Sequence, residues 1–127
     1  MENLIIEGTQ KTPSIHFSKE TGVLEIKGRS IPENSIEFYK PINEWIANYG
    51  EQPKGSTTVD IKLEYFNTSS SKCILDLLKA LEAINGKGTD IKVNWYFEED
   101  DEDMEEAGED YQAIIKLPFT MVEVDEI

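Results

Sequence analysis

Position 68 begins a run of four hydroxyl-bearing residues, Thr68-Ser69-Ser70-Ser71, directly after Asn67. A hydroxyl can accept a phosphoryl group, which brings about 1.5 to 2 negative charges and three strong acceptor oxygens. Small polar side chains can also cap a helix by accepting hydrogen bonds from the free N–H groups of its first turn. Because hydroxyls are common at helix starts, the residues alone favour a plain cap, and a phosphorylation switch at Thr68 stays open beside it.

The segments around this run predict a strand that leads directly into a helix. Residues 57–66 place apolar side chains at 59, 61, 63 and 65, which is typical of a strand with one buried face. From Ile74 to Ile84 the apolar residues recur at helical spacing. Residues 90–97 alternate again and then become aromatic, so 57–97 is predicted to form a β-α-β unit with parallel strands. The helix start would favour an anion through its free N–H groups and its dipole.

The chain before residue 57 predicts a β-hairpin followed by a helix. A short strand at 4–7 precedes strands at 14–18 and 23–28, and a four-residue turn ending at Gly22 joins the latter two. The polar loop 29–35 leads to a helix over 36–49, capped by Asn34 with Glu37 as its capping-box partner. Pro41 predicts a kink near 37–41, or two short helices that meet there.

Residues 98–110 hold ten acidic side chains and no basic one. We expect a loop that enters a helix over about 103–111, with Met104, Ala107 and Tyr111 on its inward face. A strand at 114–117 is expected to stop at Pro118, and 119–124 to continue it or to form an edge strand. The acids lack the spacing and the central glycine of an EF-hand loop, so we expect no metal. A solvated face, or one that selects a basic surface on a partner, is the expected role.

Composition limits the classes of function. The 127 residues suffice for a single domain, 1–127, with one hydrophobic core. A net charge of −14 disfavours binding to nucleic acid or to an anionic membrane surface. No apolar run is long enough to span a bilayer, and the N-terminus does not resemble a signal peptide, so a cytoplasmic location is expected.

Two reactive residue types occur once each, and neither predicts an enzyme. Cys73 falls on the predicted helix beside Ile74 and has no second cysteine, so we expect it to pack in the interior. His16 falls on a strand, where alternation predicts that it is exposed, and no spacing suggests an orienting acid or an oxyanion site. We therefore expect no catalytic residue and no cofactor.

The segment Tyr65-Phe66-Asn67-Thr68-Ser69-Ser70-Ser71-Lys72 resembles the signature of SiaC-type bacterial regulatory phosphoproteins, whose fold resembles STAS domains and anti-sigma-factor antagonists. The resemblance runs in order along nearly the whole chain, through Gly28-Arg29-Ser30-Ile31-Pro32-Glu33-Asn34, Asn94-Trp95-Tyr96 and the acidic segment. It implies that a kinase of the histidine-kinase-like ATPase fold phosphorylates Thr68 and that a PP2C-type phosphatase reverses this. It further implies that the unmodified form binds an output protein, in the best-known systems a diguanylate cyclase.

Together with the patterns above, this resemblance predicts a single STAS-like α/β domain. Its mixed sheet is expected to have five or six strands, including the N-terminal β-hairpin, with helices mainly on one face. Within it, Asn67, Ser69 and Ser70 are expected to shape the helix start and to form part of the partner-binding surface.

The loop that contains Arg29, Glu33 and Asn34 is a second candidate for partner binding. If its helix start lies at the same end of the sheet as Thr68, Arg29 could approach a phosphate on Thr68, or Glu33 could oppose it. The simpler interpretation is a turn with an N-cap. The alternative for the whole protein is a constitutive protein-binding or scaffold domain, in which the Asn-Thr-Ser-Ser segment only caps a helix.

Overall fold

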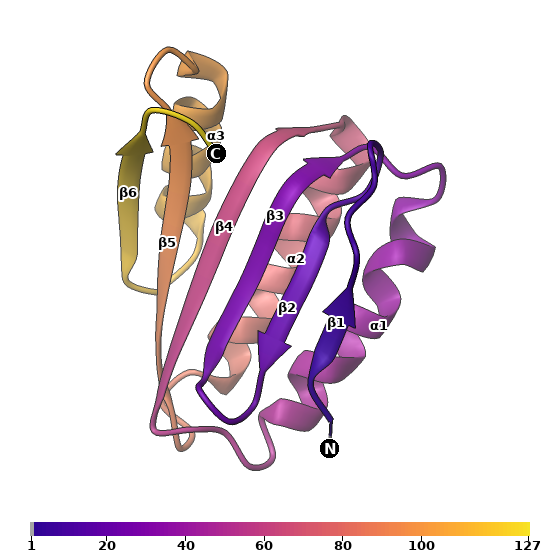
Figure 1. Ribbon diagram of the computed structural model, residues 1–127. Coiled ribbons are helices and arrows are strands. Elements are labelled where there is room, and N and C mark those ends of the chain that lie inside the picture. Colours follow the sequence, from indigo (N-terminus) through magenta and orange to yellow (C-terminus); the bar gives the residue numbers. More distant parts are fainter. Residues whose placement is uncertain (1) are drawn as a thin grey trace.

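The computed structural model describes residues 2–127, and its single six-stranded sheet keeps the strands in chain order from β1 to β6 (Figure 1). The strands are β1 (Leu4–Ile6), β2 (Ser14–Ser18), β3 (Val23–Ser30), β4 (Ser56–Phe66), β5 (Asp90–Glu98) and β6 (Phe119–Val124). The helices are α1 (Ser35–Tyr49), α2 (Thr68–Ile84) and α3 (Glu102–Ile114). The predicted α/β class and mixed sheet are confirmed.

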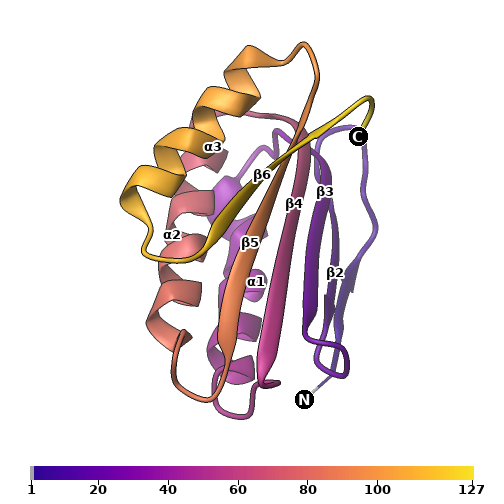
Figure 2. The ribbon, with the colours of Figure 1, turned by 90° about the vertical axis from the view of Figure 1, so that its left-hand side faces the viewer.

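The sheet divides into an antiparallel and a parallel part. β1, β2 and β3 pair antiparallel, whereas β3, β4, β5 and β6 pair parallel. One helix connects each parallel pair, and Figure 2 shows all three helices on the same face of the sheet. This is the arrangement that successive crossovers of one hand produce. The predicted β-α-β unit over 57–97 is therefore the middle one of three.

The core lies between the helices and the face of the sheet that they cover. Alternate strand residues are fully buried there, and the helices contribute residues at helical spacing. The largest of these side chains are Phe17, Tyr39, Tyr49 and Trp95. Cys73 is buried among them and His16 is exposed, as predicted.

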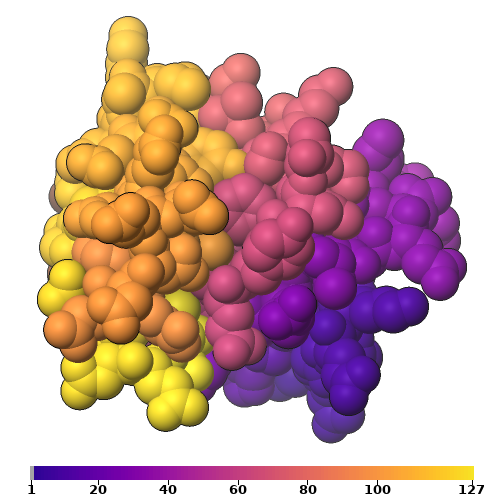
Figure 3. Space-filling model, turned by 90° about the horizontal axis from the view of Figure 1, so that it is seen from above, coloured from indigo at the N-terminus to yellow at the C-terminus, as the bar shows by residue number. Residues whose placement is uncertain are grey.

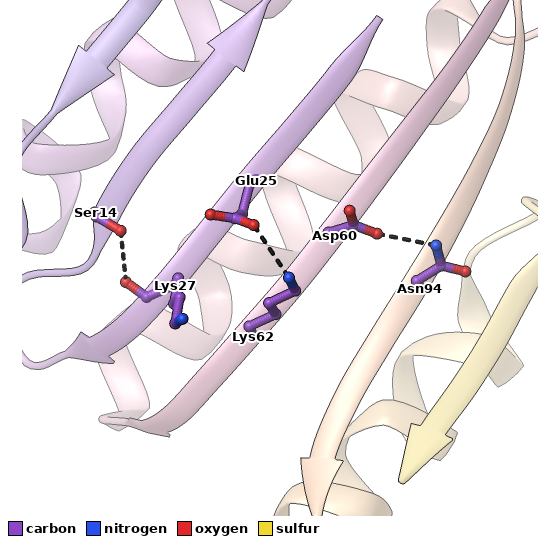
Figure 4. A network of polar contacts seen from close by, with 6 residues as sticks. All are labelled: Ser14, Glu25, Lys27, Asp60, Lys62 and Asn94. Carbon is purple, nitrogen blue, oxygen red and sulfur yellow. Dashed lines mark hydrogen bonds and ion pairs between the residues drawn. The ribbon is translucent and has the colours of Figure 1, made fainter. Parts of the chain in front are cut away.

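The other face of the sheet is mostly polar, and no helix within residues 2–127 covers it. Figure 4 shows the Glu25–Lys62 ion pair at 3.1 Å and the hydrogen bond from Asn94 Nδ2 to Asp60 Oδ1 at 2.9 Å. Lys62 Nζ also lies 4.9 Å from the centre of the Tyr96 ring. Charged and amide side chains that satisfy one another across strands suit a face exposed to water.

A register shift between Gly28 and Arg29 corrects the predicted pattern of β4. Gly28 pairs with Leu63 and Arg29 pairs with Tyr65, so Glu64 is the extra residue of a bulge. Gly28 has φ of 121°, which only glycine adopts readily. The prediction that Tyr65 shares the buried face with 59, 61 and 63 is wrong, because the bulge leaves Tyr65 50% exposed.

Three boundaries also differ from the sequence prediction. β3 includes Arg29 and Ser30, which were expected in the following loop. Pro41 lies within one continuous helix rather than between two short ones; there it is exposed and removes only the hydrogen bond to the carbonyl of Glu37. No strand forms at 114–117, because α3 runs to Ile114 and the Ile115 N–H closes it on Tyr111 O at 2.8 Å.

Candidate functional site

Two helices begin side by side at the end of the sheet where the parallel strands finish. β3 leads to α1 and its neighbour β4 leads to α2, so both helix starts lie at the carboxyl edge. Figure 3 looks onto this end and shows α2 (pink) between α3 (orange) and α1 (purple). The arrangement confirms that the Asn34 and Thr68 segments share one end of the sheet.

An asparagine caps each of these two helices. Asn34 Oδ1 accepts a hydrogen bond from the Glu37 N–H at 3.1 Å, and Asn34 Nδ2 donates to Glu37 Oε2 at 3.3 Å. Asn67 Oδ1 accepts from the Ser70 N–H at 2.9 Å, while the Asn67 N–H donates to Ser30 O at 3.0 Å. The caps therefore fix where each helix begins and tie the start of α2 to the end of β3.

A buried network of hydroxyls joins β3, α1 and α2 beneath these caps. Ser30 Oγ donates to Ser70 Oγ at 2.8 Å, and Ser70 Oγ donates in turn to Ser30 O at 3.0 Å. Tyr39 Oη lies 2.7 Å from Ser30 Oγ, and burial raises the pKa of Tyr39 to about 12. The phenol thus stays neutral and able to donate at physiological pH.

Ser69 connects the two helix starts directly. Its Oγ lies 2.7 Å from Ser35 Oγ, the first residue of α1, and donates to Asn67 Oδ1 at 3.2 Å. Local sequence patterns place Ser69 and Ser70 at one helix start but do not indicate Ser30, Ser35 and Tyr39 as their partners. No local pattern signals this contact, because the repeated asparagine-hydroxyl pairs at 34–35 and 67–68 would match Ser35 with Thr68 and not with Ser69.

Thr68 differs from its neighbours because its side chain is exposed and unengaged. It is the first residue of α2, and its hydroxyl makes no hydrogen bond to any of residues 2–127. Ser70, by contrast, is fully buried, and the hydroxyl of Ser69 is held between two oxygens. Of these three hydroxyls, only that of Thr68 can be modified without first breaking a contact.

Arg29 and Glu33, the predicted site residues outside the two caps, lie at the same end of the sheet and make no hydrogen bond to the Thr68 hydroxyl within residues 2–127. Arg29 lies with its guanidinium carbon 5.8 Å from the centre of the Tyr65 ring, and Glu33 is exposed in the loop before α1. The β1–β2 loop reaches the same end, where the Ile31 N–H donates to Lys11 O at 2.8 Å. The structure therefore brings the two predicted segments together and adds a third.

The acidic segment reaches the same edge of the sheet. Asp101 caps α3 by accepting from the Met104 N–H at 3.0 Å, and Trp95 Nε1 donates to Met104 O at 3.0 Å. Farther along, Tyr111 Oη donates to Ser71 O at 2.7 Å, which joins α3 to the first turn of α2. Burial raises the pKa of Tyr111 to about 12, so this donor also stays protonated.

Residues 2–127 contain neither a metal-binding cluster nor a membrane-spanning helix. No three His, Cys, Asp or Glu side chains in this part of the chain come together as a metal site requires. None of its helices is both long enough and apolar enough to cross a membrane.

The chain is similar to known proteins over nearly its whole length. A family model described as SiaC family regulatory phosphoprotein matches residues 6–124. An uncharacterized protein of Pseudomonas aeruginosa is 32% identical over 126 residues, covering 99% of this chain and 100% of the relative.

Solved structures match as well. SiaC of Pseudomonas aeruginosa is 30% identical, with a TM-score of 0.88 over 98% of this chain and 100% of that one. A crystal structure of the diguanylate cyclase SiaD in complex with its activator SiaC, also from Pseudomonas aeruginosa, contains a chain with 30% identity and a TM-score of 0.88. That match covers 95% of this chain and 99% of the other.

Proposed function

Because the chain belongs to the SiaC family of regulatory phosphoproteins, we propose that reversible phosphorylation of Thr68 switches its binding to an output protein. The protein is a regulator in this proposal and not an enzyme. Its unmodified form binds the output protein, and phosphate on Thr68 weakens that complex.

The observation that carries the proposal is the free hydroxyl of Thr68 at the start of α2. A kinase must reach an exposed hydroxyl, and Thr68 is exposed while its neighbours in the cap are engaged. A phosphate there would lie beside the first-turn N–H groups and the positive end of the helix dipole, so folding would tolerate it. The surface that a partner meets would still change in charge and shape.

The surrounding residues would then act as a frame and as the partner-binding surface. Asn67 and Ser70 hold the start of α2 against β3, and Ser69 links it to α1. Arg29, Glu33 and Asn34 present the adjoining surface at the same end of the sheet, so a partner bound over Thr68 would meet them too.

The partners follow from the family and from the relative's complex. We propose a kinase of the histidine-kinase-like fold, a PP2C-type phosphatase and, as the output protein, a diguanylate cyclase. The last rests on the solved complex of SiaC with SiaD in a 30% identical relative. Because the kinase uses ATP and a diguanylate cyclase uses GTP, the cytoplasm is the proposed location.

Intact-mass measurement of the protein isolated from its native cells tests the switch. We expect a fraction with one added phosphate, mapped by fragmentation to Thr68, and none in Thr68→Ala. Ser71→Ala is the matched control, because this hydroxyl makes no hydrogen bond within residues 2–127, and it should keep the phosphate. An unphosphorylated protein under every growth condition would instead favour the alternative of a constitutive binding domain.

Binding measurements test the consequence. Thr68→Ala should bind the output protein as the unmodified form does. Thr68→Glu should bind it more weakly, although one carboxylate supplies less charge than a phosphate. Equal binding by the phosphorylated and unmodified proteins would contradict the switch while leaving the family assignment intact.

A further inference from the structure

A hollow of about 290 Å³ opens beside the candidate site, between the end of β4 and the first turns of α3. Its apolar lining comes from Tyr65, Phe66, Met104 and Ala107. Tyr65 is 50% exposed, a large fraction for an aromatic side chain next to a hollow. When a partner covers apolar surface of this kind, the free energy of the complex falls.

A second hollow of about 250 Å³ continues the first along α3. It is lined by Phe66, Ser71, Ala107, Asp110 and Tyr111, so Phe66 and Ala107 belong to both. The two form one shallow groove between α3 on one side and the end of β4 with the first turn of α2 on the other. We call it the α3 groove, and its position is the border between orange and pink in Figure 3.

The polar lining of the α3 groove has one sign of charge. Its carboxylates are Glu64, Asp101, Asp103 and Asp110, and no Lys, Arg or His lines either hollow. Within residues 2–127 the one ion pair is that of Lys62 with Glu25 on the open face of the sheet, so these four carboxylates have no cationic partner. An occupant of complementary charge must therefore supply the cations.

We propose that the α3 groove binds a segment of a partner protein in which apolar side chains are flanked by arginine or lysine. The two hollows would take two apolar side chains, and the basic residues would face the acidic rim. The negative charge of the groove disfavours nucleic acids and anionic lipids as occupants. Among residues 2–127 the acidic side chains do not converge as a metal site requires.

This inference goes beyond the proposed function and does not require phosphorylation of Thr68. The two are neighbours, however, because Ser71 lines the groove and lies three residues after Thr68 on α2. Residues at this spacing share one side of a helix. A partner seated in the groove would therefore extend toward Thr68.

Two double variants of α3 separate the effect of the carboxylates that line the groove from the effect of the protein's net charge. Asp103→Lys with Asp110→Lys reverses two acids that line the groove. Glu105→Lys with Glu109→Lys reverses two exposed acids of the same helix that line neither hollow, and it changes the net charge equally. Each pair has one member in the first turn and one just past the middle of the helix, so effects on the helix dipole are matched.

The probes are peptides selected on the wild-type protein from a displayed library of random 12-residue sequences, then synthesised with a fluorophore. We expect enrichment of sequences with arginine or lysine beside leucine, phenylalanine or methionine. Their dissociation constants should rise roughly tenfold or more for the variant at 103 and 110, and less than about twofold for the variant at 105 and 109. Amide chemical shifts should change at 64–66 and 101–111.

A variant that keeps the charge completes the test. Ala107→Met places a longer apolar side chain into the part shared by both hollows and should also weaken the peptides, while its far-ultraviolet spectrum stays native. Selection of peptides without basic residues, equal losses in both double variants, or shifts on the open face of the sheet would each overturn the proposal. So would a library selection that enriches nothing.

Discussion

The hydroxyls of Ser35 and Ser69 lie 2.7 Å apart and join the starts of two helices that are 34 residues apart in the sequence. This contact lies immediately beside Thr68, whose own hydroxyl is free. The first turn of α2 is thus connected to α1 through Ser35, and to β3 through the bonds between Ser70 and Ser30. Among residues 68–71, Thr68 alone is exposed with a free hydroxyl, because Ser69 and Ser70 are engaged and Ser71 is half-buried.

The cap of α2 should depend on Asn67 and not on Thr68. Asn67→Ala removes the acceptor of the Ser70 N–H and should lower the free energy of unfolding by about 1–2 kcal/mol. Thr68→Ala removes no hydrogen bond within residues 2–127 and should change it by less than about 0.5 kcal/mol. Urea unfolding followed by circular dichroism measures both. An equal loss in the two variants would make Thr68 part of the cap.

The buried hydroxyl of Ser70 should contribute more to the free energy of unfolding than the hydroxyl of Ser71. Ser70→Ala removes the hydroxyl that accepts from Ser30 Oγ and donates to Ser30 O in the interior. We therefore expect the free energy of unfolding to fall by about 1–3 kcal/mol. Ser71→Ala is the control, because the contact of Ser71 with Tyr111 Oη is made by its backbone carbonyl and not by its hydroxyl. This variant should change the free energy of unfolding by less than about 0.5 kcal/mol. Similar values for both, again from urea unfolding, would mean that the buried network adds little.

Gly108 should not tolerate a side chain. A Cβ at this position would overlap the indole of Trp95 and lie 2.7 Å from Met121 Cε, so α3 would have to move away from β5 and β6. Gly108→Ala should lower the free energy of unfolding by about 1–3 kcal/mol despite the better helix propensity of alanine. Gly55→Ala is the control, because a Cβ there meets nothing within 4 Å. Thermal unfolding that ranks the two variants equally would contradict this close packing.

Stability should fall at alkaline pH because burial holds two tyrosines in the protonated form in the folded state. The pKa values of Tyr39 and Tyr111 are each raised from 10.0 to about 12, chiefly by burial. Between pH 10 and about 12 the unfolded chain loses these protons while the folded chain keeps them, so unfolding becomes more favourable as pH rises. Below pH 10 their contribution is constant.

Unfolding in urea from pH 9 to 11.5 measures this dependence. Tyr39→Phe and Tyr111→Phe should each make the decline shallower over that range, whatever stability they lose through their hydrogen bonds to Ser30 and Ser71. An unchanged slope in both variants would show that neither tyrosine is the protected group.

The sequence by itself determined most of the elements, because periodicity and capping are local properties, although the strand predicted at 114–117 does not form. The helix of Thr68–Ile84 follows from the spacing of its apolar residues and from Asn67, and the hairpin follows from the turn that Gly22 closes at φ of 73°. The exposure of His16 and the burial of Cys73 follow from the same patterns. The resemblance that the signature around Thr68 carries is likewise confirmed as family membership.

Only the tertiary structure decided what each polar residue does. Alternation placed Tyr65 in the core, but a bulge that depends on pairing with β3 turned it outward to line the α3 groove. Four hydroxyls in a row looked alike until the neighbouring strand and helix supplied partners for Ser69 and Ser70. Of the two hydroxyls left without a partner, only that of Thr68 belongs to an exposed residue, because Ser71 is half-buried. Both outcomes rest on contacts between residues far apart in the chain, which no local pattern records.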